Sequence, residues 1–147
     1  MAVRFIKVAD PNYFKKCLLI RKTVFIDEMH ISEDQEIDEY DALGSPYADH
    51  FLIEFNGMGI GNIRAVKNDD DIQLGRFCIL KEYRGIGLGT MTLKMFEYYY
   101  YNLGYKHITL HAIREAVPLY QRLGYTIASD AFSEAGYEHF LMEKYIH

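Results

Sequence analysis

The chain has few cysteines, no long apolar run and no uninterrupted apolar segment near its N-terminus. Its two cysteines among 147 residues, Cys17 and Cys78, lie inside apolar stretches, so we expect reduced core thiols and not a disulfide scaffold. No apolar run approaches the roughly 20 residues of a membrane span. Charges at Arg4, Lys7 and Asp10 interrupt the segment where a secretory signal needs its apolar core. The expectation is a cytoplasmic protein that does not bind membranes.

Basic residues are absent from one long part of the chain. Residues 23–63 hold no Lys or Arg but ten acids, although the whole chain has 16 basic and 21 acidic residues and a net charge of −5. A negative net charge argues against a nucleic-acid partner. The acidic stretch could attract a cationic ligand or could be a solvated loop, and charge alone favours the loop.

The residues that are present are typical of one folded domain over residues 1–147. Half of them are hydrophobic, and a chain of this length buries enough surface to fold on its own. Asp10-Pro11 is typical of a helix start, and that helix should continue through Phe25. Gly104 and Gly124 should end two later helices, over residues 88–103 and 115–123. Apolar patterns and turn residues predict strands at residues 2–8, 47–55, 60–66, 72–80, 106–112, 125–129 and 139–145. The sum is a mixed α/β fold.

A glycine-rich segment carries the strongest chemical signal. Residues 84–90 read Arg-Gly-Ile-Gly-Leu-Gly-Thr, after a predicted strand and at the start of a helix. Glycines let the backbone approach a ligand closely, and helix-start N–H groups favour an anion, so the segment suits a phosphate or pyrophosphate. It lacks the lysine of a P-loop and the glycine spacing of a dinucleotide fingerprint. The six histidines show no metal-ligand spacing, so no metal site is predicted.

The same segment carries a family resemblance. Arg-Gly-x-Gly-x-Gly preceded by residues 80–83, Leu-Lys-Glu-Tyr, resembles the acetyl-CoA pyrophosphate loop of the GNAT superfamily of N-acetyltransferases. Residues 116–125, Ala-Val-Pro-Leu-Tyr-Gln-Arg-Leu-Gly-Tyr, are similar to that superfamily's A-x-x-x-Y-x-x-x-G-F/Y segment. The resemblance covers nearly the whole chain and extends to the small ElaA/YjcF-like subgroup, which broad family schemes group with glucosamine-6-phosphate N-acetyltransferases. Further matching positions are Arg21, Val24, Phe25, Glu28, His50, Gly61, Arg64, Arg76, His139 and Met142.

The resemblance implies a fold and a co-substrate site. The fold is a central mixed, mostly antiparallel sheet of six to seven strands with flanking helices and a parallel strand pair that splays apart. Acetyl-CoA is the implied co-substrate, with its pantetheine arm along the backbone of Phe77, Cys78 and Ile79. The implied pyrophosphate contacts are Arg84, Gly85, Ile86, Gly87, Leu88, Gly89 and Thr90.

The resemblance also implies catalytic residues. Tyr120 occupies the position of the superfamily tyrosine that often protonates the leaving thiolate, and a phenol suits that role; the alternative is a core tyrosine. His111, at the end of the 106–112 strand, could accept the amine proton; the alternative is a structural histidine. Cys78 should be an inert buried thiol.

The acceptor and the assembly are the least determined features. Glu28 could attract an ammonium group, and Arg64 and Arg76 could bind a phosphate or carboxylate, although surface charge and ion pairing are their alternatives. The predicted activity is transfer of an acetyl group to a primary amine of a small molecule, such as glucosamine 6-phosphate. A non-catalytic CoA-binding or sensing domain and a protein or peptide N-acetyltransferase are the competing hypotheses. Residues 141–145 would form an edge strand that could pair with a second copy in a homodimer.

Overall fold

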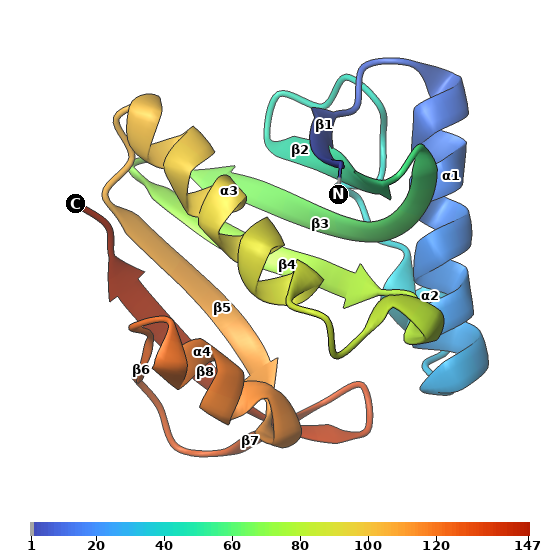
Figure 1. Cartoon of the computed structure of the whole chain (residues 1–147). Helices are drawn as coiled ribbons and strands as arrows, with labels where there is room; N and C mark the ends of the chain where they lie inside the picture. The colour runs from blue at the N-terminus through green and yellow to red at the C-terminus, as the bar shows by residue number, and fades with distance from the viewer. Residues whose placement is uncertain (1) are drawn as a thin grey trace.

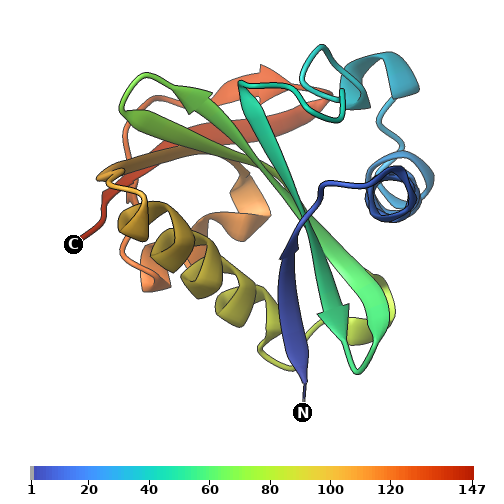
Figure 2. The ribbon, with the colours of Figure 1, turned by 90° about the horizontal axis from the view of Figure 1, so that it is seen from above.

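The computed structural model describes residues 2–147, which form one twisted mixed sheet with helices on both faces (Figures 1 and 2). Within these residues the sheet has eight strands, in the order β1-β2-β3-β4-β5-β8-β6, with β7 also paired to β8. Among the strand pairs of the described residues, only β4 and β5 run parallel; the other pairs are antiparallel. The strands are β1 Val3–Lys7, β2 Ala48–Phe55, β3 Met58–Asn68, β4 Asp71–Ile79, β5 His107–Ile113, β6 Thr126–Ile127, β7 Phe132–Glu134 and β8 Tyr137–Tyr145. The predicted fold class is confirmed, with β7 as the strand that the sequence did not predict.

The helices divide between the two faces of the sheet, with α1 on one and α3 and α4 on the other (Figure 2). Asp10 caps α1, since its Oδ1 accepts a 2.9 Å hydrogen bond from the Tyr13 N–H, as the sequence predicts. The predicted continuation through Phe25 is a π-helical segment, η1. The helical segments are α1 Pro11–Arg21, η1 Lys22–Glu28, α2 Glu33–Glu36, η2 Lys81–Tyr83, α3 Leu88–Asn102, η3 Arg114–Ala116 and α4 Val117–Arg122. None of them is long and apolar enough to cross a membrane.

Two apolar cores follow from this arrangement. The larger lies between the sheet and α3 and α4, and Phe51, Phe96 and Tyr100 are fully buried in it. The smaller lies under α1 and includes Cys17 and Cys78, both free thiols as the sequence predicts. Burial raises the pKa of each thiol to about 12, so both stay protonated at neutral pH.

The parallel strands β4 and β5 stay together for only part of their length. Asp71 to Leu74 pair with His107 to Leu110. Beyond that point β4 follows β3 as far as Ile79, whereas β5 follows β8 as far as Ile113. The register of β3 against β4 shifts between Asn62 and Arg64, opposite Arg76, whose φ is +49°; such a β-bulge turns a strand away from its neighbour. The splayed pair is therefore present and visible in Figure 1.

Two local predictions need correction. The turn between the strands predicted over residues 60–66 and 72–80 is shorter than those bounds imply and consists only of Asp69 and Asp70, because β3 and β4 pair through Asn68 and Asp71. Residues 141–145 are only partly a free edge strand: Met142 pairs with Leu110 of β5 on one side and Ile127 of β6 on the other. Backbone groups used on both sides cannot pair with a second copy. Among the described residues Lys144 and Tyr145 pair with β5 alone, and the homodimer stays a prediction.

Candidate active site

The glycine-rich segment forms an uncapped start to α3. Gly85 and Gly87 have φ of +81° and +87°, a region that side-chain-bearing residues rarely adopt. Gly87 is the residue before α3, and no side chain caps the helix there; the Met91 N–H is bonded to the Gly87 carbonyl at 3.1 Å. The N–H groups of the first turn are therefore available to an external acceptor. A 15-residue helix also presents the positive end of its dipole here, so the segment fits a phosphate.

The divergence of β4 and β5 leads toward this loop. Phe77, Cys78 and Ile79 lie on the part of β4 that has no β5 partner, where main-chain groups facing the gap can bind an extended ligand. A Cβ on Gly61 of β3 would lie 2.8 Å from the Cys78 carbonyl oxygen, so glycine allows β3 to pack closely behind this part of β4. The three predicted pantetheine contacts are thus brought next to the predicted phosphate loop.

Arg84 and Glu28 are held together at the mouth of this gap. The Arg84 guanidinium donates two hydrogen bonds to the Glu28 carboxylate, at 2.6 and 2.8 Å, and its Nε donates to the Ile79 carbonyl at 2.8 Å. These hydrogen bonds hold the pKa of Glu28 below its ordinary value, so Glu28 is ionised at neutral pH. One residue predicted to bind the co-substrate and one predicted to bind the acceptor therefore lie in direct contact.

Arg64 and Arg76 belong to a buried ion-pair network with Arg21. Arg21 is fully buried and pairs with Glu36 and Asp41, each at 2.6 Å. Arg64 contacts Asp38 at 2.7 Å and Asp41 at 3.0 Å, and Arg76 contacts Asp38 at 3.2 Å. Burial alone would raise the pKa of Asp41, but hydrogen bonds from Arg21 hold it far below the ordinary range. The network fixes α2 and the following loop against α1 and the sheet.

Most acids of the acidic stretch are therefore paired with basic residues. Six of the ten have basic partners within 4.0 Å, drawn from elements far away in sequence. The expected solvated loop is wrong for Glu36, Asp38 and Asp41, because Arg21, Arg64 and Arg76 neutralise them in the buried network. Asp49 and Glu54 are buried on β2, whereas Glu28 stays exposed beside Arg84. The six are Glu28, Glu36, Asp38, Asp41, Asp49 and Glu54.

Tyr120 lies in α4 and is 7% exposed. Within residues 2–147 its hydroxyl has no hydrogen-bond partner, and its ring meets Tyr125 edge-on at 5.7 Å between centroids. Burial raises the pKa of Tyr120 above the ordinary phenol value, so the hydroxyl keeps its proton at any physiological pH. Its protonation state is the one that a proton donor needs.

His111 lies one residue beyond Leu110, the last β5 residue paired with β4. It lies opposite the α3 face, since its β5 neighbours Leu110 and Ala112 belong to the larger core. Its Nδ1 is 3.0 Å from Glu134 Oε1, and the Phe132 ring meets it edge-on at 5.1 Å. Sequence reasoning missed Glu134, which lies 23 residues away along the chain in an unpredicted strand and in no motif.

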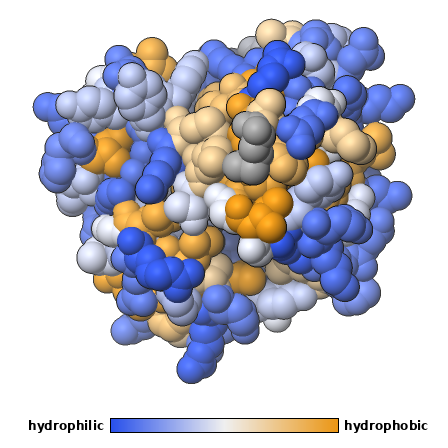
Figure 3. Space-filling model, viewed as in Figure 1, coloured by the Kyte–Doolittle hydropathy of each residue, from blue (hydrophilic) through white to orange (hydrophobic). Residues whose placement is uncertain are grey.

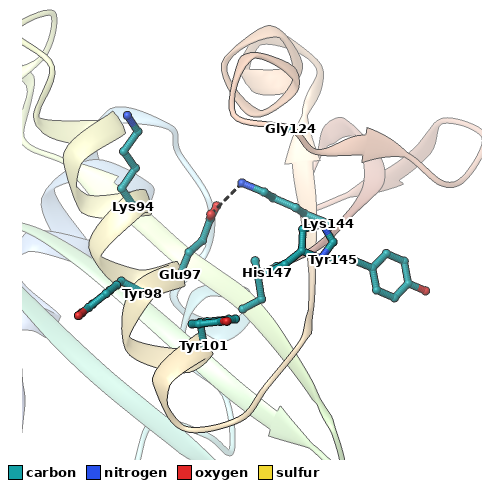
Figure 4. A pocket seen from close by; sticks show the side chains of 9 residues that line it. Lys94, Glu97, Tyr98, Tyr101, Gly124, Lys144, Tyr145 and His147 are labelled. Atoms are coloured by element: carbon teal, nitrogen blue, oxygen red, sulfur yellow. Dashed lines mark hydrogen bonds and ion pairs between the residues drawn. The ribbon is translucent and has the colours of Figure 1, made fainter.

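Two cavities of the structure lie away from these residues. One of about 730 Å³ lies between α3 and the C-terminal end of β8 and includes none of the predicted site residues. Figure 4 shows its two inner charges, Lys144 and Glu97, pointing at one another, 2.8 Å apart. Another, of about 630 Å³, lies between α3 and Phe5. On the face of the molecule seen in Figure 1, Figure 3 shows many hydrophilic side chains with apolar patches between them.

Comparison with known proteins agrees with this geometry. The family model for the acetyltransferase (GNAT) domain matches residues 23–146. The uncharacterized protein YyaT of Bacillus subtilis is 39% identical over 89% of this chain and 88% of its own length. The uncharacterized N-acetyltransferase YjcF of the same organism is 30% identical over 92% and 94%.

Solved structures share the whole fold. The crystal structure described as that of an N-acetyltransferase from Lactobacillus plantarum has a TM-score of 0.91 at 26% identity, and the match covers 100% of both chains. Escherichia coli ElaA has a TM-score of 0.83 at 22% identity over 97% of this chain and 99% of its own. The PaiA N-acetyltransferase of Thermoplasma acidophilum, solved in complex with coenzyme A, has a TM-score of 0.77 at 15% identity over 99% of both chains. The chain therefore belongs to the GNAT family of acetyltransferases, in the ElaA/YjcF-like subgroup, and is an acyltransferase.

Proposed function

We propose that this single domain transfers the acetyl group of acetyl-CoA to a primary amine of a small molecule, by direct attack in a ternary complex. The observation that carries the proposal is the gap between β4 and β5, which leads to the uncapped, glycine-flanked start of α3. An extended chain that ends in a pyrophosphate matches both parts. The coenzyme A bound to the PaiA structure supports the same co-substrate.

In the proposed site, main-chain groups of Phe77, Cys78 and Ile79 align the pantetheine arm. The N–H groups of residues 85–90 bind the pyrophosphate, with Arg84 as a nearby positive charge. Such positioning supplies much of the rate enhancement when two substrates must meet in one geometry.

The proposed residues transfer protons to the departing sulfur and from the attacking nitrogen. The amine nitrogen bonds to the acetyl carbonyl carbon, and the bond between that carbon and sulfur breaks. Tyr120 donates its proton to the departing sulfur, and His111 accepts a proton from the nitrogen. Solvent then returns a proton to Tyr120 and removes one from His111, so the products are an amide and a free thiol.

An amino-sugar phosphate is the more specific acceptor that the sequence predicts, but the ion pairs of Arg64 and Arg76 argue against its phosphate. Arg64 and Arg76 were the residues predicted to bind its phosphate, and they are engaged by Asp38, Asp41 and Glu36. A phosphate would have to displace carboxylates from a buried network, which favours an acceptor without one. Glu28 remains the proposed group for the substrate ammonium.

Release of free CoA thiol tests the proposal. The protein is mixed with acetyl-CoA and a panel of small primary amines, glucosamine 6-phosphate among them, and with peptides that have a free α-amine. Thiol release with a small amine supports the proposal. Acetyl-CoA binding without release would instead indicate a sensing domain, and release with peptides alone a peptide N-acetyltransferase.

A further inference from the structure

Glu134 is the hydrogen-bond partner of His111 Nδ1. The contact joins His111 Nδ1 to Glu134 Oε1 at 3.0 Å. A carboxylate can only accept a hydrogen bond, so Nδ1 must carry the hydrogen. In the neutral ring Nε2 is then a lone-pair acceptor, and within residues 2–147 no group donates to it. The His111 side chain is 34% exposed, so its ring is accessible to a ligand.

The neighbouring charged groups leave this pairing intact. His139 of β8 has Nε2 at 3.7 Å from Glu134 Oε2, beyond hydrogen-bond distance. Its Nδ1 donates to the Tyr137 carbonyl at 2.9 Å, because a carbonyl can only accept, so neutral His139 has no proton on Nε2 to offer Glu134. Phe132 of β7 contacts both rings.

The remaining charges around this hairpin are engaged elsewhere. Glu138 of β8 pairs with Arg114 of η3 at 3.0 Å. On β4, Arg76 pairs with Asp38 at 3.2 Å. The hydrogen-bond partner of Glu134 is therefore His111.

The β7–β8 hairpin is also tied to the predicted acceptor side. The Tyr137 hydroxyl donates to the Met29 carbonyl at 2.5 Å, one residue after Glu28, which itself contacts Arg84 of the glycine-rich segment. The hairpin therefore joins the end of η1 on the face opposite α3. His111 and Glu134 lie where β5 has already separated from β4.

We propose that Glu134 is a positioning residue that fixes His111 as the Nδ1–H tautomer and presents Nε2 to the acceptor amine. This inference rests on the proposed function of His111. Which imidazole nitrogen is free is set by the hydrogen bond that the other makes. A glutamine at position 134 could donate as well as accept, and would remove that constraint.

The experiment compares Glu134→Gln with Glu138→Gln, a neighbouring acid of the same hairpin that pairs with Arg114. Nitrogen-15 spectra of labelled histidine, recorded above pH 8, give the His111 tautomer. Steady-state kinetics give kcat and the KM for acetyl-CoA. Glu134→Gln should make Nε2–H appear on His111 and lower kcat about tenfold or more, with little change in that KM. Glu138→Gln should change neither, and Glu134→Asp should restore part of the wild-type tautomer signal.

Two results would overturn the inference: wild-type His111 in the Nε2–H form, or an unchanged His111 spectrum in Glu134→Gln. Because the spectrum does not depend on turnover, it separates this inference from the proposed function. Full turnover in His111→Ala would remove the base while leaving the tautomer result valid.

Discussion

Tyr120 differs from the other buried tyrosines in its hydroxyl. Tyr100 donates to Asp49 at 2.6 Å, and Tyr125 donates to Glu97 at 2.9 Å. The Tyr120 hydroxyl lacks such a partner within residues 2–147 and is not among the buried unpaired side-chain atoms, so it is accessible to solvent. A hydroxyl left unpaired in the folded chain is available to a ligand, which is the observation that motivates its role as proton donor.

Tyr120→Phe should lower turnover about 100-fold or more, the usual size of a general-acid contribution, with acetyl-CoA affinity and thermal stability unchanged. Tyr125→Phe is the matched control. It should lose about 1–3 kcal/mol of stability with its hydrogen bond to Glu97 but keep its turnover. Steady-state kinetics and denaturant unfolding measure both effects. Wild-type turnover in Tyr120→Phe would exclude Tyr120 from the mechanism.

Helix α1 is fixed to α2 and the following loop by charge as well as by apolar contact. Arg21→Met would leave Glu36, 3% exposed, and Asp41 without their principal partner. Breaking a buried pair in this way costs about 3–5 kcal/mol. Lys22→Met, at an exposed neighbouring position, should change stability by less than about 0.5 kcal/mol. Chemical denaturation of the two variants makes the comparison, and equal stabilities would show that the network contributes nothing net.

The closed end of the β4–β5 pair carries a pH-dependent contact. His107 lies between Asp71, 3.0 Å from Nδ1, and Glu143, 2.8 Å from Nε2. Burial alone would lower the pKa of His107, but the two carboxylates raise it above its ordinary value of 6.5. The charged ring therefore joins β4, β5 and β8 at the end opposite the gap.

A raised folded-state pKa stabilises the fold fully below pH 6.5, the unfolded value, and the contribution disappears as the pH rises through the folded value. Because both carboxylates are partly exposed, the loss should be about 1 kcal/mol or less. Unfolding free energies measured from pH 6 to pH 9 should show this decline in the wild type and a smaller one in His107→Gln. Parallel profiles would contradict the assignment.

The sequence predicted the helices and strands better than it predicted the side-chain contacts between them. Asp10-Pro11, Gly104 and Gly124 marked helix ends through local backbone preferences, and the long strands followed from apolar patterns. β7 was missed because three residues contain no readable period. Arg21 lies within the helix that the sequence predicts after Asp10-Pro11, yet it is a buried cation whose acidic partners lie 15 and 20 residues away; no local pattern encodes such pairing. In the proposed site, Gly85 to Thr90 and Tyr120 were predicted from motifs, whereas the Glu134–His111 contact depends on chain folding.

Across the whole molecule, the proposed functional residues lie on the two faces of one sheet. The α3 side holds the proposed phosphate loop and Tyr120, and the opposite side holds Glu28 and His111. The gap between β4 and β5 connects them, so the two substrates can meet at the sheet without sharing a cavity. A ligand that spans the gap should therefore stabilise the entire fold.

Acetyl-CoA at a hundredfold excess over its dissociation constant should stabilise the native chain by about 2.7 kcal/mol. For a chain of this size that corresponds to a rise in Tm of about 6–10 °C. Gly87→Glu should abolish the rise, since it places a negative charge in the proposed phosphate site. Gly57→Glu should keep the rise, because Gly57 has a similar φ of +83° but lies in the β2–β3 hairpin. A thermal-shift titration with NAD and ATP as controls measures this, and an equal rise with those nucleotides, or none with acetyl-CoA, would contradict the co-substrate assignment.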